Sequence, residues 1–230
     1  MANFINYRAT GAFGGNREVF NKDEGTWYQK VKNGAKLSTT HCPAYEEFLQ
    51  AGSFGYFNES TGVVSLLKVF TLAAEVTPTS TTVKIYQRPY DPVLKTGDVI
   101  MVAPATPSTT GIAITVGTLT SALVGTDAVV TFPITAEDLS ATVTYPVGTL
   151  FVIGASAGSG KLPAIPNVNV IFAETVQITK PLRTSDFQNG YADLTTSLYY
   201  HACIDRELVA IPDYVESLCK ISNSALWFQL

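Results

Sequence analysis

The feature that most constrains this chain is a run of short β-type segments between Val63 and Gly160. Each segment is rich in Val, Ile, Thr or Phe and ends at Gly or Pro, which is typical of strands joined by turns. The segments expected to form strands are Val63–Leu72, Thr81–Gln87, Asp98–Ala103, Gly111–Gly117, Ala128–Phe132, Ala141–Tyr145 and Thr149–Ile153. Short strands with turns between them favour an antiparallel barrel or sandwich over βαβ units.

The same stretch carries almost no charge. No Lys or Arg occurs between Lys95 and Lys161, whereas threonine is frequent there. Natural sheets commonly place lysines on their edge strands, where they prevent the addition of further strands. Their absence predicts an edge that a partner covers. The whole chain is only 15% charged, against about 25% in typical soluble domains, so we expect other subunits to cover much of its surface.

Composition also excludes several classes of protein. With 230 residues, 46% of them hydrophobic, the chain has enough apolar surface to fold around its own core and is not a disordered protein. No apolar run reaches the length of a membrane span. The net charge of −4 argues against nucleic acid as the main partner. The first residues lack the order of a secretory signal, and three scattered cysteines are read as reduced thiols of a cytoplasmic setting.

Three parts follow from this pattern: 1–62, an N-terminal arm with one short helix; 63–160, the β-rich module; and 161–230, a long strand followed by C-terminal helices. The arm is rich in glycine and shows no lasting apolar period, so it has to lie on a neighbouring surface. The helix is expected to begin at Pro43 and to stop at Gly52. The aromatic residues expected to anchor the arm in protein–protein contacts are Phe13, Phe20, Trp27 and Tyr28.

In the last part, apolar residues alternate along Asn167–Thr179 and predict one long strand. Leu194–Val209 shows apolar steps of three and four, the spacing of a helix, and Pro212 is expected to break it. Asp213 and Glu216 favour a new helical first turn after the break. The predicted fold class is therefore α+β: a mainly antiparallel β module, barrel- or sandwich-like, with an extended N-terminal arm and a kinked long C-terminal helix.

The segment from Gly154 to Lys161 is the most tempting chemical motif, because it resembles a phosphate-binding loop. Such a loop needs Gly, four residues and Gly-Lys-Ser/Thr before a helix. Here Ala155 replaces the first glycine, Leu162 replaces the hydroxyl residue, and Pro163 follows where the helix would begin. We interpret the segment as a flexible Gly/Ser linker.

A zinc site is equally poorly supported. The only histidines each lie near a cysteine, as the pairs His41–Cys42 and His201–Cys203. Adjacent residues rarely point at one metal ion, and His-x-Cys on a helix points its two side chains about 200° apart. No nucleophile elbow or paired carboxylates occur either. The sequence predicts no enzyme and no catalytic, cofactor-binding or metal site.

The order of features in Lys95–Thr179 resembles a group of major capsid proteins of tailed bacteriophages. It runs Lys-Thr-Gly-Asp-Val-Ile-Met-Val, a β-hairpin stretch, Pro-Val-Gly-Thr-Leu-Phe-Val-Ile-Gly, a small-residue linker and Asn-Val-Asn-Val-Ile-Phe-Ala-Glu-Thr-Val-Gln-Ile-Thr. In that family a β-rich insertion on an extended loop returns as a long strand. Leu194–Val209 resembles the long spine helix, and the ending with Trp227 and Phe228 resembles the segment that closes it. Val170 stands where the family usually shows Gln.

The resemblance implies a virion structural protein that assembles in the host cytoplasm by contacts with other capsid subunits, as a homo-oligomer. A complete family subunit would continue beyond Leu230, so we expect a shortened or auxiliary capsid protein. Trp227 and Phe228 join the expected contact residues. The alternative is a phage head fibre, decoration or adhesin module that binds host surface carbohydrate. No membrane, specific nucleic acid or cofactor is expected to bind.

Overall fold

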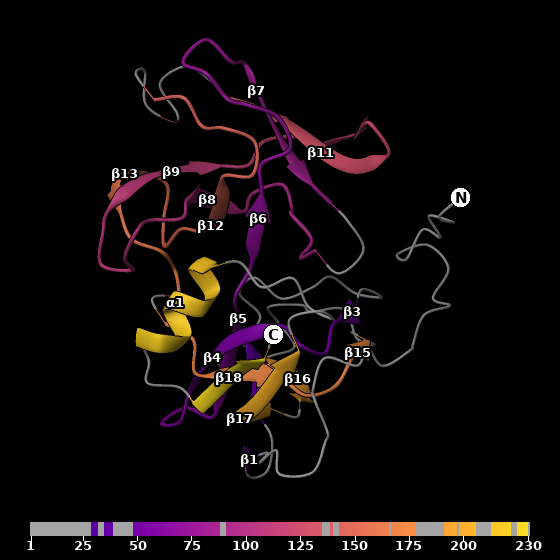
Figure 1. Cartoon of the computed structure of the whole chain (residues 1–230), viewed down its shortest axis with the longest axis vertical. Helices are drawn as coiled ribbons and strands as arrows, with labels where there is room; N and C mark the ends of the chain where they lie inside the picture. The colour runs from indigo at the N-terminus through magenta and orange to yellow at the C-terminus, as the bar shows by residue number, and fades with distance from the viewer. Residues whose placement is uncertain are drawn as a thin grey trace. The chain divides into compact units, whose positions relative to one another are not determined.

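The structure, a computed structural model, describes residues 29–31, 35–38, 48–87, 91–134, 139, 143–165, 167–177, 191–196, 198–205, 213–221 and 225–229. The chain forms two compact units (Figure 1). Unit 1 combines Met1–Leu67 with Asn167–Leu230, and unit 2 is Lys68–Pro166. Unit 2 is therefore an insertion in the sequence of unit 1.

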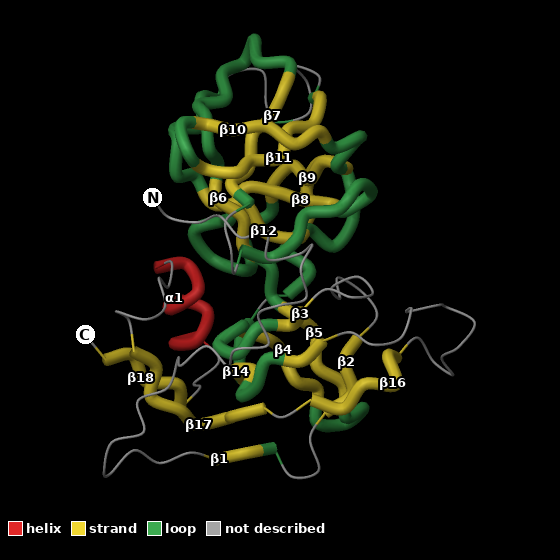
Figure 2. The backbone as a smooth tube through the Cα atoms, turned by 90° about the vertical axis from the view of Figure 1, so that its right-hand side faces the viewer, coloured by secondary structure: helices red, strands yellow, loops and turns green. Residues whose placement is uncertain are grey.

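Two antiparallel sheets build unit 2 (Figure 2). Its strands are β6 (Val69–Thr71), β7 (Thr82–Tyr86), β8 (Val99–Val102), β9 (Gly111–Thr115), β10 (Thr120–Val124), β11 (Asp127–Pro133), β12 (Leu150–Ile153) and β13 (Gly158–Lys161). One sheet has the order β10-β11-β7, the other β13-β9-β8-β12-β6. A bridge between Leu72 and Ile85 joins the two sheets at β6 and β7.

One apolar core fills the space between these sheets. Val83, Val130 and Phe132 come from the three-stranded sheet, and Ile100 and Phe151 come from the five-stranded one; all are buried in the same cluster. Alternate residues of each strand point into this core, as the period of two along a strand requires. Burying such side chains stabilises the fold by about 1.5–3 kcal/mol each.

The chain after β12 crosses the opposite face of the five-stranded sheet. The Gly154 N–H donates to the Val99 carbonyl (2.9 Å), and Gly154 bridges Pro163. A Cβ atom at Gly154 would lie 3.0 Å from Cβ of Ala113 and 3.4 Å from Cγ1 of Val99. An alanine at this position would require these neighbours to shift by a few tenths of an ångström. The crossing places β13 beside β9, and Met101 below it is fully buried.

The described residues of unit 1 form an eight-stranded sheet, a two-stranded sheet and a helix. Its elements are β1 (Gln29–Lys30), β2 (Ala35–Ser38), β3 (Phe48–Leu49), β4 (Phe54–Asn58), β5 (Val63–Leu66), β14 (Val170–Phe172), β15 (Val176–Gln177), β16 (Tyr191–Thr196), β17 (Leu198–Asp205), α1 (Asp213–Ile221) and β18 (Ala225–Gln229). The large sheet has the order β1-β17-β14-β4-β5-β2-β16, with β18 parallel to β17, and β3 pairs with β15.

The core of unit 1 is drawn from residues that lie far apart in the sequence. Leu37, Val64, Val170, Phe172 and Leu198 belong to one buried cluster. A side chain extends the pairing between β14 and β4: the Asn169 Oδ1 accepts from the Phe57 N–H (2.8 Å), while the Asn169 Nδ2 donates to the Phe57 carbonyl (2.9 Å). The amide group thus replaces a backbone partner and aligns the two strands.

The predicted α+β class is wrong, because the fold is all-β. The expected long helix Leu194–Val209 is instead occupied by β16 and β17, which pair with β2 and β14. The apolar residues of this segment are spaced as in a helix, but it also contains two Thr, two Tyr and Ile204, residue types that favour strands once partner strands are present. A helix does begin at Asp213, where a new first turn was expected after Pro212, but the described residues before it form β17 rather than a helix that Pro212 could break. Among the described residues α1 is the only helix.

Three further expectations are corrected. The segment Asn167–Thr179 is not one strand, since β14 ends at Phe172 and β15 begins at Val176. Between these two strands, the Thr175 Oγ1 accepts a hydrogen bond from the Ala51 N–H (3.1 Å). The helix predicted from Pro43 is wrong over Phe48–Leu49, which forms β3, and its earlier part lies outside the described residues. The supposed Gly/Ser linker includes β13 and is held in the five-stranded sheet.

Candidate functional surface: the edge of β10

The outer strand of the three-stranded sheet is the most exposed strand of unit 2. Thr120, Ser121, Ala122 and Leu123 are all exposed, so β10 is open on both faces. Leu123 has 70% of its surface exposed, the largest fraction of any large apolar residue in the described ranges. One edge of β10 pairs with β11 in a regular register without a bulge, and no described strand pairs with its other edge.

The direction of the backbone groups along this edge follows from the register. The Gln87 N–H donates to the Ala128 carbonyl (2.8 Å), so the backbone groups of Ala128 face β7 and away from β10. Ala128 is directly opposite Leu123, which makes this pair a non-hydrogen-bonded one. The N–H and C=O of Leu123 therefore point outward, and so do those of Ser121, two residues earlier. The edge presents two donors and two acceptors.

The position of Leu123 on the sheet is also unusual. It is opposite Ala128, and Ser121 is opposite Val130. Val130 and Phe132 point into the core of unit 2, and opposite residues of an antiparallel pair share a face. Leu123 and Ser121 thus lie on the core side of the sheet, at a point where the described core does not reach. A further strand beside β10 would continue that face.

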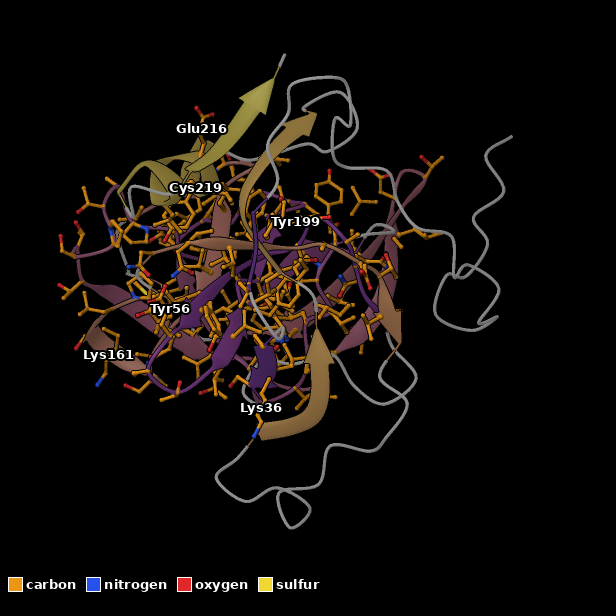
Figure 3. All side chains as sticks on the ribbon, turned by 90° about the horizontal axis from the view of Figure 1, so that it is seen from below. Lys36, Tyr56, Lys161, Tyr199, Glu216 and Cys219 are labelled. Carbon is orange, nitrogen blue, oxygen red and sulfur yellow. The ribbon has the colours of Figure 1, made fainter. Side chains whose placement is uncertain are left out.

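The five-stranded sheet ends differently, at β13. This strand has four residues, its register against β9 shifts between Gly158 and Lys161, and Gly158 and Gly160 adopt positive φ angles of 114° and 66°. Lys161 points away from the ribbon at this edge (Figure 3). A short strand, a bulge and a lysine are three of the devices by which proteins prevent edge-to-edge pairing. β10 has none of them.

The buried polar groups of unit 2 serve its loops. The Lys68 Nζ donates to the Val93 carbonyl (3.2 Å) and lies 3.5 Å from the Asp98 Oδ2, which also accepts from the Lys95 N–H (3.0 Å). The Gln87 Nε2 donates to the Pro92 carbonyl (2.9 Å), and its Oε1 accepts from the Leu94 N–H (3.2 Å). These contacts fix residues 91–98 against the strands.

No group of three or more His, Cys, Asp or Glu in the described ranges is close enough to hold a metal ion. Burial raises the pKa of Tyr214 to about 12 and also raises the pKa of Tyr145, whose hydroxyl donates to the Leu139 carbonyl (2.9 Å). Both phenols are therefore neutral near pH 7. Helix α1 is too short to cross a membrane, and no other helix occurs in the described part of the chain.

None of the residues predicted to make contacts belongs to β10. Phe13, Phe20, Trp27 and Tyr28 lie outside the described residues. Trp227 and Phe228 lie in β18, beside Cys203 and Ile204 of β17, and their role in contacts stays a prediction.

Sequence reasoning anticipated an unprotected edge in the module but did not assign β10 to a strand. Its residues, Thr-Ser-Ala-Leu-Val, include Ser and Ala, which are weak strand formers. The signal that could have found it is Gly125-Thr126 between two β-type segments, a two-residue turn that predicts a hairpin with β11.

Fold and surface together define the chain as an all-β protein of two units, with an exposed, uncharged sheet edge at β10 of unit 2. Comparison with protein-family models, with curated proteins and with solved structures finds no match.

Proposed function

We propose that this chain is a virion structural protein, a capsid or capsid-associated subunit that acts by assembling with other copies through protein–protein contacts. The observation that carries the proposal is the β10 edge, which presents backbone donors, backbone acceptors and an exposed leucine. Such an edge is an aggregation hazard in a free monomer and is normally protected. It is useful in a protein whose working state is an assembly.

The distribution of charge supports the same proposal. The chain has 15 basic and 19 acidic residues, and residues 96–160 contain four of the acidic ones and none of the basic ones. The excess negative charge therefore lies entirely in this stretch, and none of it lies on β10. Of those four, Asp98 is paired with Lys68. A surface with so little charge is suited to contact with other proteins rather than to isolation in water.

The resemblance to tailed-phage capsid proteins is the reason for proposing a virion as the assembly. It supports the proposal less than the exposed surface of β10 does. The spine helix that it implied is replaced by β16 and β17. The proposal therefore rests on the sparse charge and the exposed β10 edge of this chain rather than on the spine helix of that family.

The test is the size of the purified full chain. Sedimentation velocity and negative-stain electron microscopy across a wide concentration range are expected to show particles or regular arrays much larger than a 24.7 kDa monomer. A monomer at every concentration, and in the presence of phage head proteins encoded beside it, would contradict the proposal. Binding of a carbohydrate array by such a monomer would instead favour an adhesin.

A further inference from the structure

We infer that the outer edge of β10 pairs antiparallel with β10 of a second copy of this chain, a step that rests on the proposed function and names its partner. The pairing joins two three-stranded sheets into one six-stranded sheet. Three observations support it: the direction of the backbone groups, the absence of charge, and the face on which Leu123 lies.

The backbone geometry selects one register. Because the N–H and C=O groups of Ser121 and Leu123 point outward, these residues have to form the hydrogen-bonded pairs of a new antiparallel ladder. When Ser121 of each copy is opposite Leu123 of the other, the pairing uses all of these outward groups and forms four hydrogen bonds. Ala122 then meets Ala122 of the second copy on the two-fold axis, as a non-hydrogen-bonded pair. Placing Leu123 opposite itself, or Ser121 opposite itself, makes fewer bonds between the two five-residue strands.

The side chains of β10 are compatible with this register. The strand Thr120–Val124 carries no charge, so two copies meet without the like-charge repulsion that opposes self-pairing of most edge strands. The pair at the axis consists of two alanines, which fit at the short Cα separation of about 4.5 Å in a non-hydrogen-bonded pair. Leu123 of each copy stands beside Ser121 of the other, with no bulky residue opposite it.

The symmetry also closes the contact. Antiparallel pairing of identical strands is isologous, so it uses the exposed edge of both copies and leaves none for a third; particles larger than a dimer then need further contacts elsewhere on the chain. At the other end of the three-stranded sheet, β7 is joined to β6 through Leu72, and β13 ends the second sheet with a bulge. The two-fold axis is perpendicular to the sheet, so the cores of both copies lie on the same face of the six strands. Leu123 lies on that face in both copies.

The experiment uses the full chain with Ala122→Cys. The inferred register brings the two introduced Cα atoms to about 4.5 Å, within the range that a disulfide bridges. Mild oxidation is expected to give a covalent dimer, with the linkage mapped by mass spectrometry to residue 122 of both chains. Thr126→Cys in the exposed turn is the matched control. In this register the two copies of Val124 are already about 13 Å apart, at 3.3 Å per residue, and the turns lie beyond them, so cysteines at residue 126 should not link. The parent chain, oxidised in the same way, is the control for linkage through its native cysteines.

A second variant tests the hydrogen bonds themselves. Leu123→Pro removes an outward N–H but no bond between β10 and β11, and proline is tolerated on an edge strand where its nitrogen faces solvent. The dissociation constant of the dimer should rise at least about tenfold, because two of four bonds are lost, while the unfolding midpoint stays near that of Leu123→Ala. Leu123→Ala keeps the N–H and should weaken the dimer less.

The outcomes separate the two proposals. Large assemblies without a link at residue 122, and with no effect of Leu123→Pro, would overturn the β10 pairing and leave the assembly function standing. Dimers linked at residue 122 that never form anything larger would support the pairing and overturn a lattice-forming or capsid-associated role. A link from Thr126→Cys equal to that from Ala122→Cys would overturn the register.

Discussion

The two sheets of unit 2 are joined at β6 and β7 by one bridge, and their other edges, β10 and β13, are built in opposite ways. At β13 the strand is short, its register is broken, two glycines adopt left-handed angles and Lys161 stands at its end. At β10 five residues run in perfect register beside β11, with no charge, no proline and an exposed leucine. Both edges belong to one small unit with one core, so overall composition cannot explain the difference.

The difference teaches that protection against sheet pairing is placed strand by strand. The stretch 96–160 contains no lysine, yet the first residue after it, Lys161, lies in the edge strand of the five-stranded sheet. The β13 edge has three protective features and the β10 edge has none. This difference is best explained if the β10 edge has a function.

The largest expected effect is a difference in unfolding free energy between a substitution in β11 and one in β10. Phe132→Ala in β11 removes a ring that is 1% exposed in the core of unit 2, and should lower the free energy of unfolding by about 3–5 kcal/mol. Leu123→Ala, on the neighbouring strand, should change it by no more than about 0.5 kcal/mol. Urea unfolding of both variants measures the two values. Equal losses would mean that β10 is part of the folding core and not a free edge.

A smaller effect is expected where the chain crosses the sheet to reach β13. Gly154→Ala places a Cβ 3.0 Å from that of Ala113, and overpacking of this kind costs about 1–3 kcal/mol. Gly117→Ala is the control, because its added Cβ meets Pro133 at an ordinary 3.5 Å. Thermal unfolding compares the two. If Gly154→Ala is as stable as Gly117→Ala, the close crossing does not fix the position of β13.

The smallest effect tests whether the protected edge depends on its lysine alone. Lys161→Thr removes the charge, but the register shift and both positive φ angles remain. The variant should sediment as the parent does at every concentration, and its free energy of unfolding should change by no more than about 0.5 kcal/mol. New self-association would show that charge, rather than strand shape, protects β13.

Local patterns predicted unit 2 far better than unit 1. The strands β7, β8, β9 and β12 lie within segments expected from the sequence, and β11 extends one residue beyond each end of its expected segment. These predictions succeed because β8–β9 and the neighbouring hairpins pair residues that are close along the chain. In unit 1, Phe57 is aligned by Asn169, 112 residues away, and β16 pairs with β2 near the other end of the chain. A periodicity rule sees only the local segment, where Leu198, Ala202 and Asp205 do fit a helix.

The sequence predicted that unit 2 has an unprotected sheet edge, but it did not predict which strand forms that edge. The missing lysines indicated an unprotected edge, yet a strand of Ser and Ala next to a Gly-Thr turn carries too weak a propensity to be recognised by itself. Which residues of the strand face outward depends on the register with β11 and β7, and therefore on Ala128 and Gln87. That information is absent from composition.

The way in which unit 2 is inserted has a consequence for its history. Strand β4 lies between β5, which comes just before the insertion, and β14, which comes just after it. Neighbouring strands are about 4.8 Å apart, so the two ends of the insertion leave from points roughly 10 Å apart on either side of one host strand. A module attached in this manner can be lengthened, exchanged or deleted while the host sheet keeps its pairing, so the inserted unit is free to diversify without any change to the scaffold that carries it.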